Sequence, residues 1–191
     1  MSPIAYDSAV PTDPDLPTAC PRRVLVAGLS GSGKTTLAAR LAEVLEVPHV
    51  ELDSLHHGPG WVPQPTFLDD VRELASREAW VTEWQYAAAR PLLAGRADTL
   101  VWLDLPFRVS LTRVVRRTLR RRIRHEVLWN GNVEPPLHTF FTDREHVVRY
   151  SVATRHKYAT LVPTALETHP LLTGVHLRSG TEVAAWVTSL H

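Results

Sequence analysis

A glycine-rich segment that ends in lysine and threonine is the part of the chain whose spacing best fits a chemical task. Residues 28–35 read Gly-Leu-Ser-Gly-Ser-Gly-Lys-Thr and match the phosphate-binding pattern G-x-x-x-x-G-K-[ST]. Glycines let such a loop curl until successive backbone N–H groups point at phosphate oxygens. A helix that begins at Gly33 would add the positive end of its dipole. The predicted phosphate contacts are Gly28, Ser30, Gly31, Ser32, Gly33, Lys34, Thr35 and Thr36.

Three side chains of this loop have distinct predicted tasks. Lys34 can reach the β- and γ-phosphates of a nucleoside triphosphate, the Thr35 hydroxyl can ligate Mg²⁺, and Thr36 is placed to touch the α-phosphate. The chain has only one other lysine, Lys157, and its remaining basic residues are arginine. An apolar run precedes the loop and a helical pattern follows it, which favours a true phosphate loop over a chance Gly/Ser turn.

Two carboxylates close neighbouring predicted strands. Asp53 ends a strand over 48–53, and Glu83 lies at the end of a strand over 79–84. Ligands of open α/β folds bind at the carboxyl edge of the sheet, where both residues would lie. Asp53 could accept a proton from a substrate hydroxyl or hold a magnesium-bound water; alternatively, it caps a turn with Ser54. The alternative for Glu83 is a surface acid at a strand end.

Histidine and aromatic residues surround these carboxylates in the sequence. His56, His57 and Trp61 follow Asp53, and Tyr86 follows the second strand. No cysteine or second histidine pair has ligand spacing with the two histidines, which argues against a metal site there. Aromatic rings can stack on a planar substrate, and packing in the core is an equal alternative for each tryptophan. The predicted substrate contacts are Asp53, His56, Trp61 and Tyr86.

Arginines recur along a predicted helix over 107–124, called the arginine helix below. They stand at positions 108, 113, 116, 117, 120, 121, 122 and 124, and helical spacing puts those at 113, 117, 120 and 124 on one face. Apolar residues at 111, 114, 115, 119 and 123 would form another side. Three interpretations remain open. The arginines clamp phosphates as a lid, they bind nucleic acid, or they form a solvated face with ion pairs.

Short apolar runs alternate with helical patterns from Arg22 onward. Strands are predicted over 23–28, 48–53, 79–84, 99–105 and 174–179. Helices are predicted over 34–46, 67–78, 87–95 (interrupted near Pro91), 107–124, 142–158 and 181–190, with loops over 54–65 and 126–138. Strands that alternate with helices indicate a parallel sheet covered on both faces. The sequence therefore predicts one α/β domain over 22–191.

The composition is ordinary for a globular chain. The 191 residues suffice for one core, and the formal net charge of +1 does not indicate a polyanion binder. Residues 1–21 hold five prolines among Asp, Ser and Thr, which predicts a flexible tail. The single cysteine, Cys20, allows no internal disulfide, as is usual in a reducing cytoplasm. No secretory start and no apolar run of ~20 residues is present. We therefore expect a cytoplasmic protein with no membrane segment.

Missing motifs narrow the class of phosphate-loop protein. No Asn-Lys-x-Asp segment that reads guanine is present, so ATP is the expected nucleotide. Motor and AAA-type ATPases have an apolar strand that ends in Asp-Glu, whereas the nearest candidate, at 100–106, ends in Asp-Leu-Pro. The chain is also too short for their accessory parts. A small phosphotransferase fits best.

From about Arg22 to Leu190 the chain resembles the adenylate-kinase-like small P-loop kinases. Within them it is most similar to the group called topology modulation protein or adenylate-kinase-related ATPase. The resemblance rests on VAGLSGSGKTTLAARLA at 26–42, ELDSL at 51–55, Trp61 and Phe67, WVTEWQY at 80–86, VWLDLP at 101–106, the arginine helix and LRSGTEV at 177–183. It implies a P-loop NTPase fold with five parallel strands in the order 2-3-1-4-5. It also implies an ATP/Mg²⁺ site, an acceptor site across the strand tips and an arginine-rich helical lid.

The resemblance also implies roles for individual residues. Arg113 and Arg117 match arginines at the start of the lid, which would cover about 116–142 and include the loop Trp129-Asn-Gly-Asn132. Arg149, on the helix after the lid, is the returning partner. Arg178 begins a segment whose backbone would contact adenine. Glu83 stands where relatives have an acid that helps order the magnesium shell, so a water-mediated role is implied.

One segment departs from the family pattern. Most relatives carry Asp-Gly-Asn-Tyr where this chain has Glu83-Trp84-Gln85-Tyr86. True adenylate kinases carry Asp-Gly-Phe-Pro-Arg there, and the arginine helps to hold AMP. No arginine follows Glu83 closely, which argues against AMP as the acceptor.

These observations predict an ATP- and Mg²⁺-dependent phosphotransferase. Its acceptor would be a small molecule, namely a nucleoside, a nucleotide or another hydroxylated metabolite, and the chain would be a monomer or homodimer. The alternative is a nucleotide-dependent regulatory ATPase that binds nucleic acid through the arginine helix. Nucleic acid is the less favoured partner. The predicted metal ligand is Thr35. The predicted catalytic residues are Lys34, Asp53, Glu83, Arg113, Arg117 and Arg149.

Overall fold

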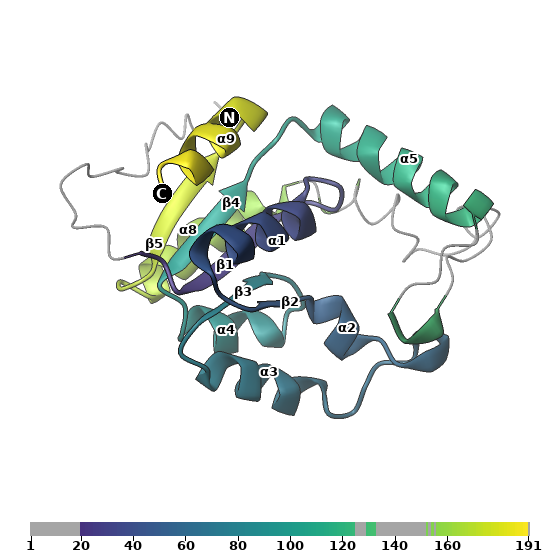
Figure 1. The fold of residues 1–191 in the computed structure, drawn as a ribbon, viewed down its shortest axis with the longest axis horizontal. Helices are drawn as coiled ribbons and strands as arrows, with labels where there is room; N and C mark the ends of the chain where they lie inside the picture. The colour runs from purple at the N-terminus through teal and green to yellow at the C-terminus, as the bar shows by residue number, and fades with distance from the viewer. Residues whose placement is uncertain (1–19, 125–128, 133–151, 153, 155, 191) are drawn as a thin grey trace, which may run out of the picture.

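Five parallel strands form the central sheet of the molecule (Figure 1). The computed structural model describes residues 20–124, 129–132, 152, 154 and 156–190. The strands are β1 (Arg23–Gly28), β2 (His49–Val50), β3 (Trp80–Glu83), β4 (Thr99–Leu103) and β5 (Thr173–Leu177). Their order is β2-β3-β1-β4-β5, and every neighbouring pair is parallel. The predicted α/β fold class and the expected strand order are therefore confirmed.

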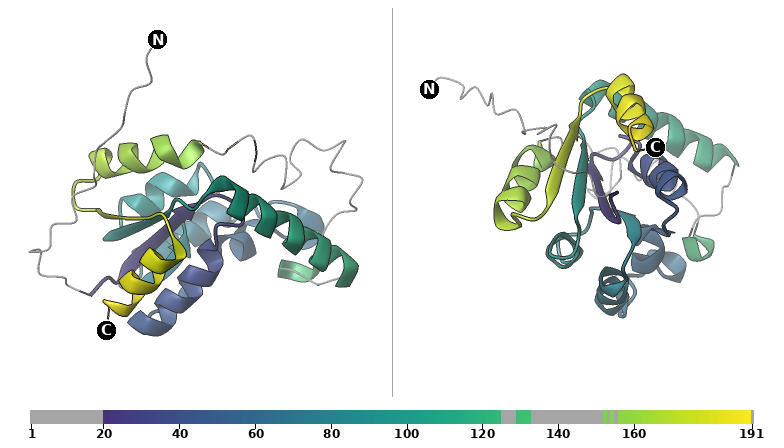
Figure 2. Two further views of the ribbon diagram at one scale, coloured as in Figure 1. Left: turned by 90° about the horizontal axis from the view of Figure 1, so that it is seen from above. Right: turned by 60° about the vertical axis from the view of Figure 1, so that its left-hand side comes forward.

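Helices cover both faces of this sheet (Figure 2). Helices α1 (Lys34–Leu45) and α9 (Gly180–Thr188) lie on one face, and α3 (Phe67–Ser76), α4 (Ala89–Ala94) and α8 (Lys157–Thr168) lie on the other. Residues 24–27 of the central strand β1 are all apolar and fully buried, and they alternate between the two cores. Among the described residues, no helix is both long and apolar enough to cross a bilayer.

The segment after β2 differs from the prediction. The strand predicted over 48–53 pairs over only two residues, because the chain turns into the short helix α2 (Leu52–His56). The Ser54 backbone N–H and Oγ both donate to the Glu51 carbonyl, at 3.1 and 2.7 Å, and Leu52 is fully buried. Asp53 therefore lies in the first turn of a helix and does not end a strand. The predicted loop over 54–65 contains the rest of α2 and a 3₁₀ turn, η1 (Pro59–Trp61).

Two prolines lie inside helices. Pro91 does not interrupt α4, because it lies in the first turn, where a backbone N–H has no helical partner. Pro163 lies in the interior of α8, and no element is predicted between 158 and 174. Tyr158, Val162 and Ala165 of this helix are buried against the sheet. Packing of this apolar face outweighs the unfavourable proline. The predicted tail over 1–21 lies outside the described residues except for 20 and 21, and most of the predicted helix over 142–158 lies outside them too.

The packing of α8 can be tested by a pair of substitutions on one helix. Val162→Ala should lower the free energy of unfolding by about 2 kcal/mol, because buried methyl groups are lost and a cavity remains. Thr164→Ala, at an exposed position of α8, should change it by less than about 0.5 kcal/mol. Urea denaturation measures both values, and equal effects of the two substitutions would contradict the observed orientation of α8.

Candidate active site

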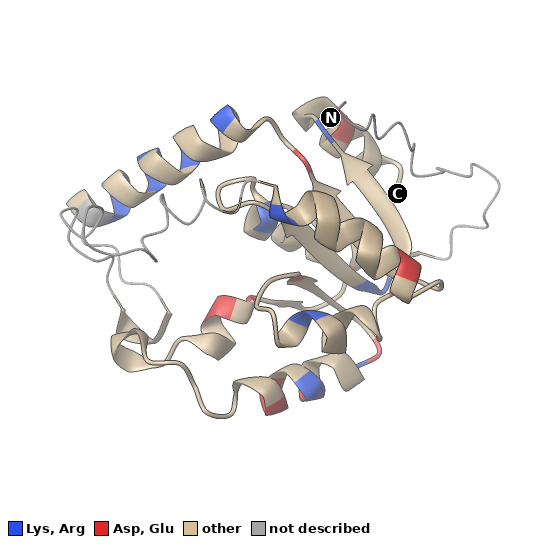
Figure 3. Cartoon of the chain, turned by 180° about the vertical axis from the view of Figure 1, so that it is seen from behind, with Lys and Arg blue, Asp and Glu red and all other residues tan. Residues whose placement is uncertain are grey.

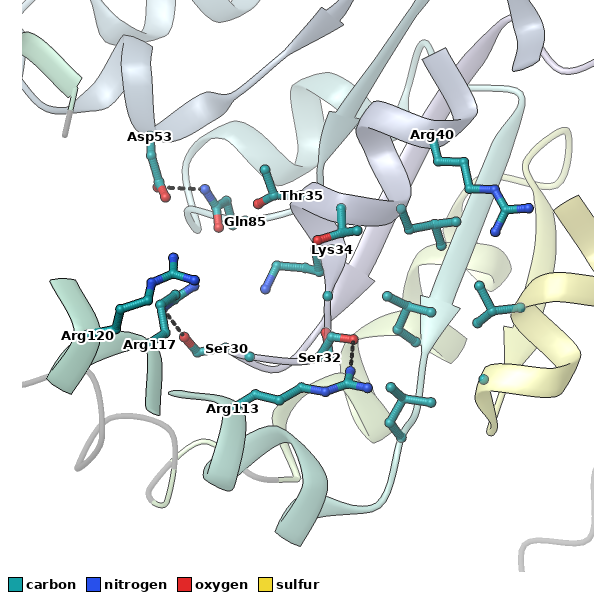
Figure 4. A pocket seen from close by; sticks show the side chains of 18 residues that line it. Ser30, Ser32, Lys34, Thr35, Arg40, Asp53, Gln85, Arg113, Arg117 and Arg120 are labelled. Atoms are coloured by element: carbon teal, nitrogen blue, oxygen red, sulfur yellow. Dashed lines mark hydrogen bonds between the residues drawn. The ribbon is translucent and has the colours of Figure 1, made fainter. Parts of the chain in front are cut away.

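A pocket of about 550 Å³ lies at the carboxyl ends of the central strands, between the phosphate loop and α5 (Phe107–Arg124) (Figure 4). Residues 30–36 line it on the loop side, and Asp53 and Gln85 line it on the side of α2 and β3. Three arginines of α5 line the opposite side: Arg113, Arg117 and Arg120. Lys34 points into the space between these groups. The phosphate loop, Asp53 and the arginine helix therefore meet at one site.

The phosphate loop touches α5 at Gly31. The backbone φ of Gly31 is +77°, a left-handed conformation that favours glycine. A β-carbon here would lie 2.4 Å from the Ser110 carbonyl oxygen and 2.5 Å from Val114 Cγ2. Among the side chains of α5 that the structure describes, three are buried, and they are spaced one helical turn apart: Ser110, Val114 and Thr118. The arginine helix thus packs on the loop through a narrow strip of small residues.

The predicted apolar side of the arginine helix is only partly the side that packs. Of the predicted residues Val114 is buried, but Val115, Leu119 and Ile123 are 36%, 40% and 75% exposed. The loop backbone at Gly31 approaches the helix too closely for a row of leucine and isoleucine side chains to lie between them. Ser110 and Val114 take the contact instead.

Lys34 is held at the base of the pocket. Its ammonium donates a hydrogen bond to the Leu29 carbonyl, 3.0 Å away. Burial lowers the pKa of Lys34 to about 8, opposed by the charges of Asp53 and Glu83, which raise it. The charge of Arg117 lowers it further. The side chain is therefore mostly protonated at neutral pH and can attract a phosphate.

Glu83 is the buried acid of the site, 2% exposed. His49 Nε2 lies 3.4 Å from Glu83 Oε1. Burial raises the pKa of Glu83, but His49, the backbone N–H of Glu83 and the nearby Thr35 hydroxyl together outweigh burial and lower it. Among the described residues neither carboxylate oxygen has a well-formed hydrogen bond. A buried, ionised carboxylate with open acceptor positions beside Thr35 suits the water shell of Mg²⁺, so the residues present fit the metal.

The α5 arginines extend along the pocket. Arg113 Nη1 donates to the Ser32 carbonyl at 3.4 Å, and Arg117 Nη2 to Ser30 Oγ at 3.5 Å. Arg120, one turn further along the helix, lines the same pocket. Figure 3 shows the basic residues as bands along this helix. The structure brings the predicted Arg113 and Arg117 to the phosphate loop, and the predicted Arg149 lies outside the described residues.

Asp53 is anchored by two donors on one oxygen. Gln85 Nε2 donates to Asp53 Oδ1 at 2.7 Å, and Tyr86 Oη donates to the same oxygen at 2.5 Å. Tyr86 Oη is also 3.1 Å from His57 Nε2. Asp53 therefore faces the pocket at the end of a hydrogen-bonded network that extends behind it.

The other predicted substrate contacts lie behind Asp53. The His56 ring stacks on the Tyr86 ring with centroids 4.1 Å apart, and Trp61 meets the His57 ring edge-on at 5.1 Å. Neither His56, Trp61 nor Tyr86 is among the residues that line the pocket. In this structure His56 contacts Tyr86, Trp61 contacts His57, and Tyr86 donates to Asp53.

The segment after α5 docks on this aromatic group. Residues 129–131 form a 3₁₀ turn, η2 (Trp129–Gly131). Trp129 Nε1 donates to Glu51 Oε2 at 2.9 Å, and Asn132 Nδ2 donates to the Gly58 carbonyl at 2.9 Å. Asn132 Oδ1 accepts the Trp61 N–H at 3.0 Å. Asparagine and tryptophan side chains thus satisfy polar groups of the segment from 51 to 61.

Arg178 stands at the turn between β5 and α9. Its N–H donates to Glu182 Oε2 at 2.8 Å, and its side chain lies 3.4 Å from His176 Nδ1. Gly180 and Val183 line the pocket nearby, whereas Arg178 does not. The predicted nucleotide contact at Arg178 therefore has its backbone donor engaged within the turn.

Sequence reasoning did not single out His49, Gln85 or Arg120 as site residues. His49 pairs with Val81, two positions before Glu83, so the period of two along parallel strands puts both side chains on the α1 face. That register cannot be seen in a sequence. Gln85 could have been found, because it follows directly on the strand that ends in Glu83. Helical spacing already put Arg120 on the face of Arg113 and Arg117, but the family resemblance assigned a role only to those two.

Comparison with known proteins identifies the fold. No family model matches the chain, and no curated protein does. The structure of shikimate kinase from Acinetobacter baumannii in complex with shikimate matches with a TM-score of 0.53 and 18% identity, over 88% of this chain and 90% of that one. A gluconokinase from Sinorhizobium meliloti 1021 matches with a TM-score of 0.51 and 21% identity, over 90% and 94%. The chain has the fold of small P-loop kinases over most of its length.

The pKa of Lys34 predicts how nucleotide affinity depends on pH. A bound triphosphate favours the charged ammonium, so the pKa in the complex lies above the value of about 8 in the free protein. Between these two values binding takes up a proton. Affinity for ATP should thus be constant below pH 8 and should weaken above it, by up to about tenfold per pH unit. Titration calorimetry from pH 6.5 to 9.5 measures this. Lys34→Arg, whose charge is fixed, should remove the dependence, and a flat wild-type profile would contradict the assignment.

The contact at Gly31 gives a second prediction. Gly31→Ala places a methyl group against the α5 backbone and strains a left-handed residue, so it should lower the free energy of unfolding by about 1–3 kcal/mol. It should also weaken ATP binding, because Arg113 and Arg117 are displaced. Gly60→Ala is a matched control, since Gly60 also has a positive φ but has no atom within 4 Å of an added β-carbon. Equal losses of ATP affinity in the two variants would contradict the role of the contact.

Proposed function

We propose that the protein is a kinase that transfers the γ-phosphoryl group of ATP to a hydroxyl group of a small molecule. The observation that carries this proposal is the arrangement around one pocket. A phosphate loop with Lys34 faces a carboxylate, Asp53, across a space bordered by arginines of α5. In this proposal phosphate-binding groups lie on one side of the pocket and a proton acceptor on the other, as transfer to a hydroxyl requires.

During the transfer the protein itself changes only by the proton that Asp53 accepts. The acceptor oxygen forms a bond to the γ-phosphorus while the bond from that phosphorus to the β–γ bridging oxygen breaks. ADP leaves with the electron pair, and the hydroxyl proton passes to the Asp53 carboxylate. Lys34, Arg113 and Arg117 stabilise the negative charge on the phosphates, since electrostatic stabilisation provides most of the rate enhancement in phosphoryl transfer.

Magnesium fits this site through two residues. The Thr35 hydroxyl would ligate the ion directly, and the buried Glu83 would hold it through water. When bound, Mg²⁺ neutralises charge on the β- and γ-oxygens. His49 beside Glu83 favours the ionised carboxylate that this role requires.

We also propose that the chain belongs with the topology modulation group of small P-loop kinases, on the motifs at 26–42, 51–55 and 80–86. The nucleic-acid alternative gains no support from α5, because Arg113, Arg117 and Arg120 border the pocket and have a task there. Ala87 stands where adenylate kinases have their AMP-binding arginine, which supports an acceptor other than AMP.

The test is ADP release from ATP and Mg²⁺ in the presence of nucleosides, nucleoside monophosphates, sugars and hydroxy acids. Shikimate and gluconate belong in the panel, because two proteins of the same fold are named shikimate kinase and gluconokinase. At least one acceptor should stimulate turnover. Lys34→Ala should abolish it, and Asp53→Asn should lower kcat by roughly 10²–10⁴ with ATP binding retained. Tight ATP binding without stimulation by any acceptor would count against a kinase.

A further inference from the structure

Asp53 has one occupied and one open carboxylate oxygen. Oδ1 accepts both Gln85 Nε2 and Tyr86 Oη, at 2.7 and 2.5 Å. Within the part of the chain that the structure describes, Oδ2 accepts no hydrogen bond, and Asp53 lines the pocket. A carboxylate held in this way has a fixed orientation, with its free oxygen available to a substrate.

With an ionised Asp53 and neutral imidazoles, the hydrogen bonds behind Asp53 have one consistent direction. An ionised carboxylate can only accept, so the Tyr86 hydroxyl must donate to it. The Tyr86 oxygen then accepts from His57 Nε2, 3.1 Å away, which must carry the proton of that ring. A neutral imidazole has one N–H, so His57 Nδ1 is an acceptor. It faces His56 Nδ1 at 3.4 Å, and His56 must donate there. Burial and then the neighbouring His57 lower the pKa of His56, which favours its neutral form.

Packing fixes the rings that make these bonds. The Tyr86 ring is stacked on His56 and meets Phe67 edge-on at 5.2 Å. Tyr86 has a φ of 57°, in the left-handed region that costs a bulky residue about 1–2 kcal/mol. Trp61, which packs on His57, has a φ of 63°. Such strained residues persist only where the surroundings hold them, and they cluster at functional sites.

We propose that His56, His57 and Tyr86 form a directed hydrogen-bond chain that positions Asp53, so that its Oδ2 receives the proton of the acceptor hydroxyl. Tyr86 and His57 are positioning residues in this proposal and do not contact the substrate. Every donor in the chain points toward Asp53, and successive bonds of one direction strengthen one another. The inference rests on the proposed function for the role of Oδ2, but the direction of the chain is independent of that function.

Kinetics with the best acceptor tests the positioning role. Tyr86→Phe keeps the ring and removes the donor, and it should lower kcat by about 10- to 100-fold while the KM for ATP changes by less than about twofold. Phe67→Leu is the packing control, since it changes a ring contact of Tyr86 but no hydrogen bond. An unchanged kcat in Tyr86→Phe, or a raised acceptor KM as its main effect, would overturn the proposal in favour of direct substrate contact.

A pair of substitutions at His57 separates the two ring nitrogens. The amide nitrogen of His57→Gln can reach the place of Nε2 and donate to Tyr86, whereas that of His57→Asn reaches only the place of Nδ1. His57→Gln should keep kcat within about threefold of the parent. His57→Asn should lower kcat by more than that but by less than Tyr86→Phe, because Tyr86 still donates to Asp53 in that variant. Equal losses in both variants would overturn the chain.

Nitrogen NMR of the full chain tests the chain without any acceptor. ¹⁵N shifts of the imidazoles at pH 7.5 should show the Nε2–H tautomer for His57 and the Nδ1–H tautomer for His56. In Tyr86→Phe the preference at His57 should weaken. An Nδ1–H tautomer at His57 overturns the proposal even if the kinase activity is established. If no acceptor stimulates turnover, the proposed function and the role of Oδ2 fail, and the tautomers still decide the direction of the chain.

Discussion

Helix α5 reaches the phosphate loop only because position 31 carries no side chain. The close approach of Gly31 to Ser110 and Val114 sets the height of the whole helix above the loop. From that height Arg113 and Arg117 contact the Ser32 carbonyl and the Ser30 hydroxyl. This one backbone contact thus brings Arg113, Arg117 and Arg120 to the pocket.

Charges of opposite sign on the two sides of the pocket have opposing effects on the pKa of Lys34. Burial and Arg117 disfavour the ammonium, and Asp53 and Glu83 favour it. The two acids are themselves held differently. Glu83 is buried beside His49 under the start of α1, whereas Asp53 is oriented from behind by Gln85 and Tyr86. Each acid is therefore suited to a separate task, one toward a hydrated cation and the other toward a hydroxyl group.

The parts of the fold that sequence reasoning predicts well depend on local patterns. The phosphate loop is read from eight consecutive residues, and β1 from an uninterrupted apolar run between turn residues. The order of the strands came from resemblance to a family, because register and order depend on contacts between distant segments. The early end of β2 depends on the burial of Leu52. Helix α8 forms around Pro163 because Tyr158, Val162 and Ala165 pack into the core on one face of the sheet. For the same reason the pairing of His49 with Glu83 and the place of Tyr86 behind Asp53 could not be foreseen.

The docking of Trp129 and Asn132 on the segment from 51 to 61 has a mechanical consequence. Near its first turns α5 rests on Gly31, and five peptide links beyond its end, a reach of at most about 18 Å, the chain is bound again to Glu51, Gly58 and Trp61. Arg121, in the last turn of α5, also lies over the Trp129 ring, 5.9 Å from its centroid, so the helix contacts the rest of the molecule near both of its ends. To tilt far from the loop it must either break the contacts of the asparagine and tryptophan side chains or carry the α2 segment with it. The positions of the α5 arginines and of the residues around Asp53 are therefore coupled. A ligand that moves one of these two groups also moves the other.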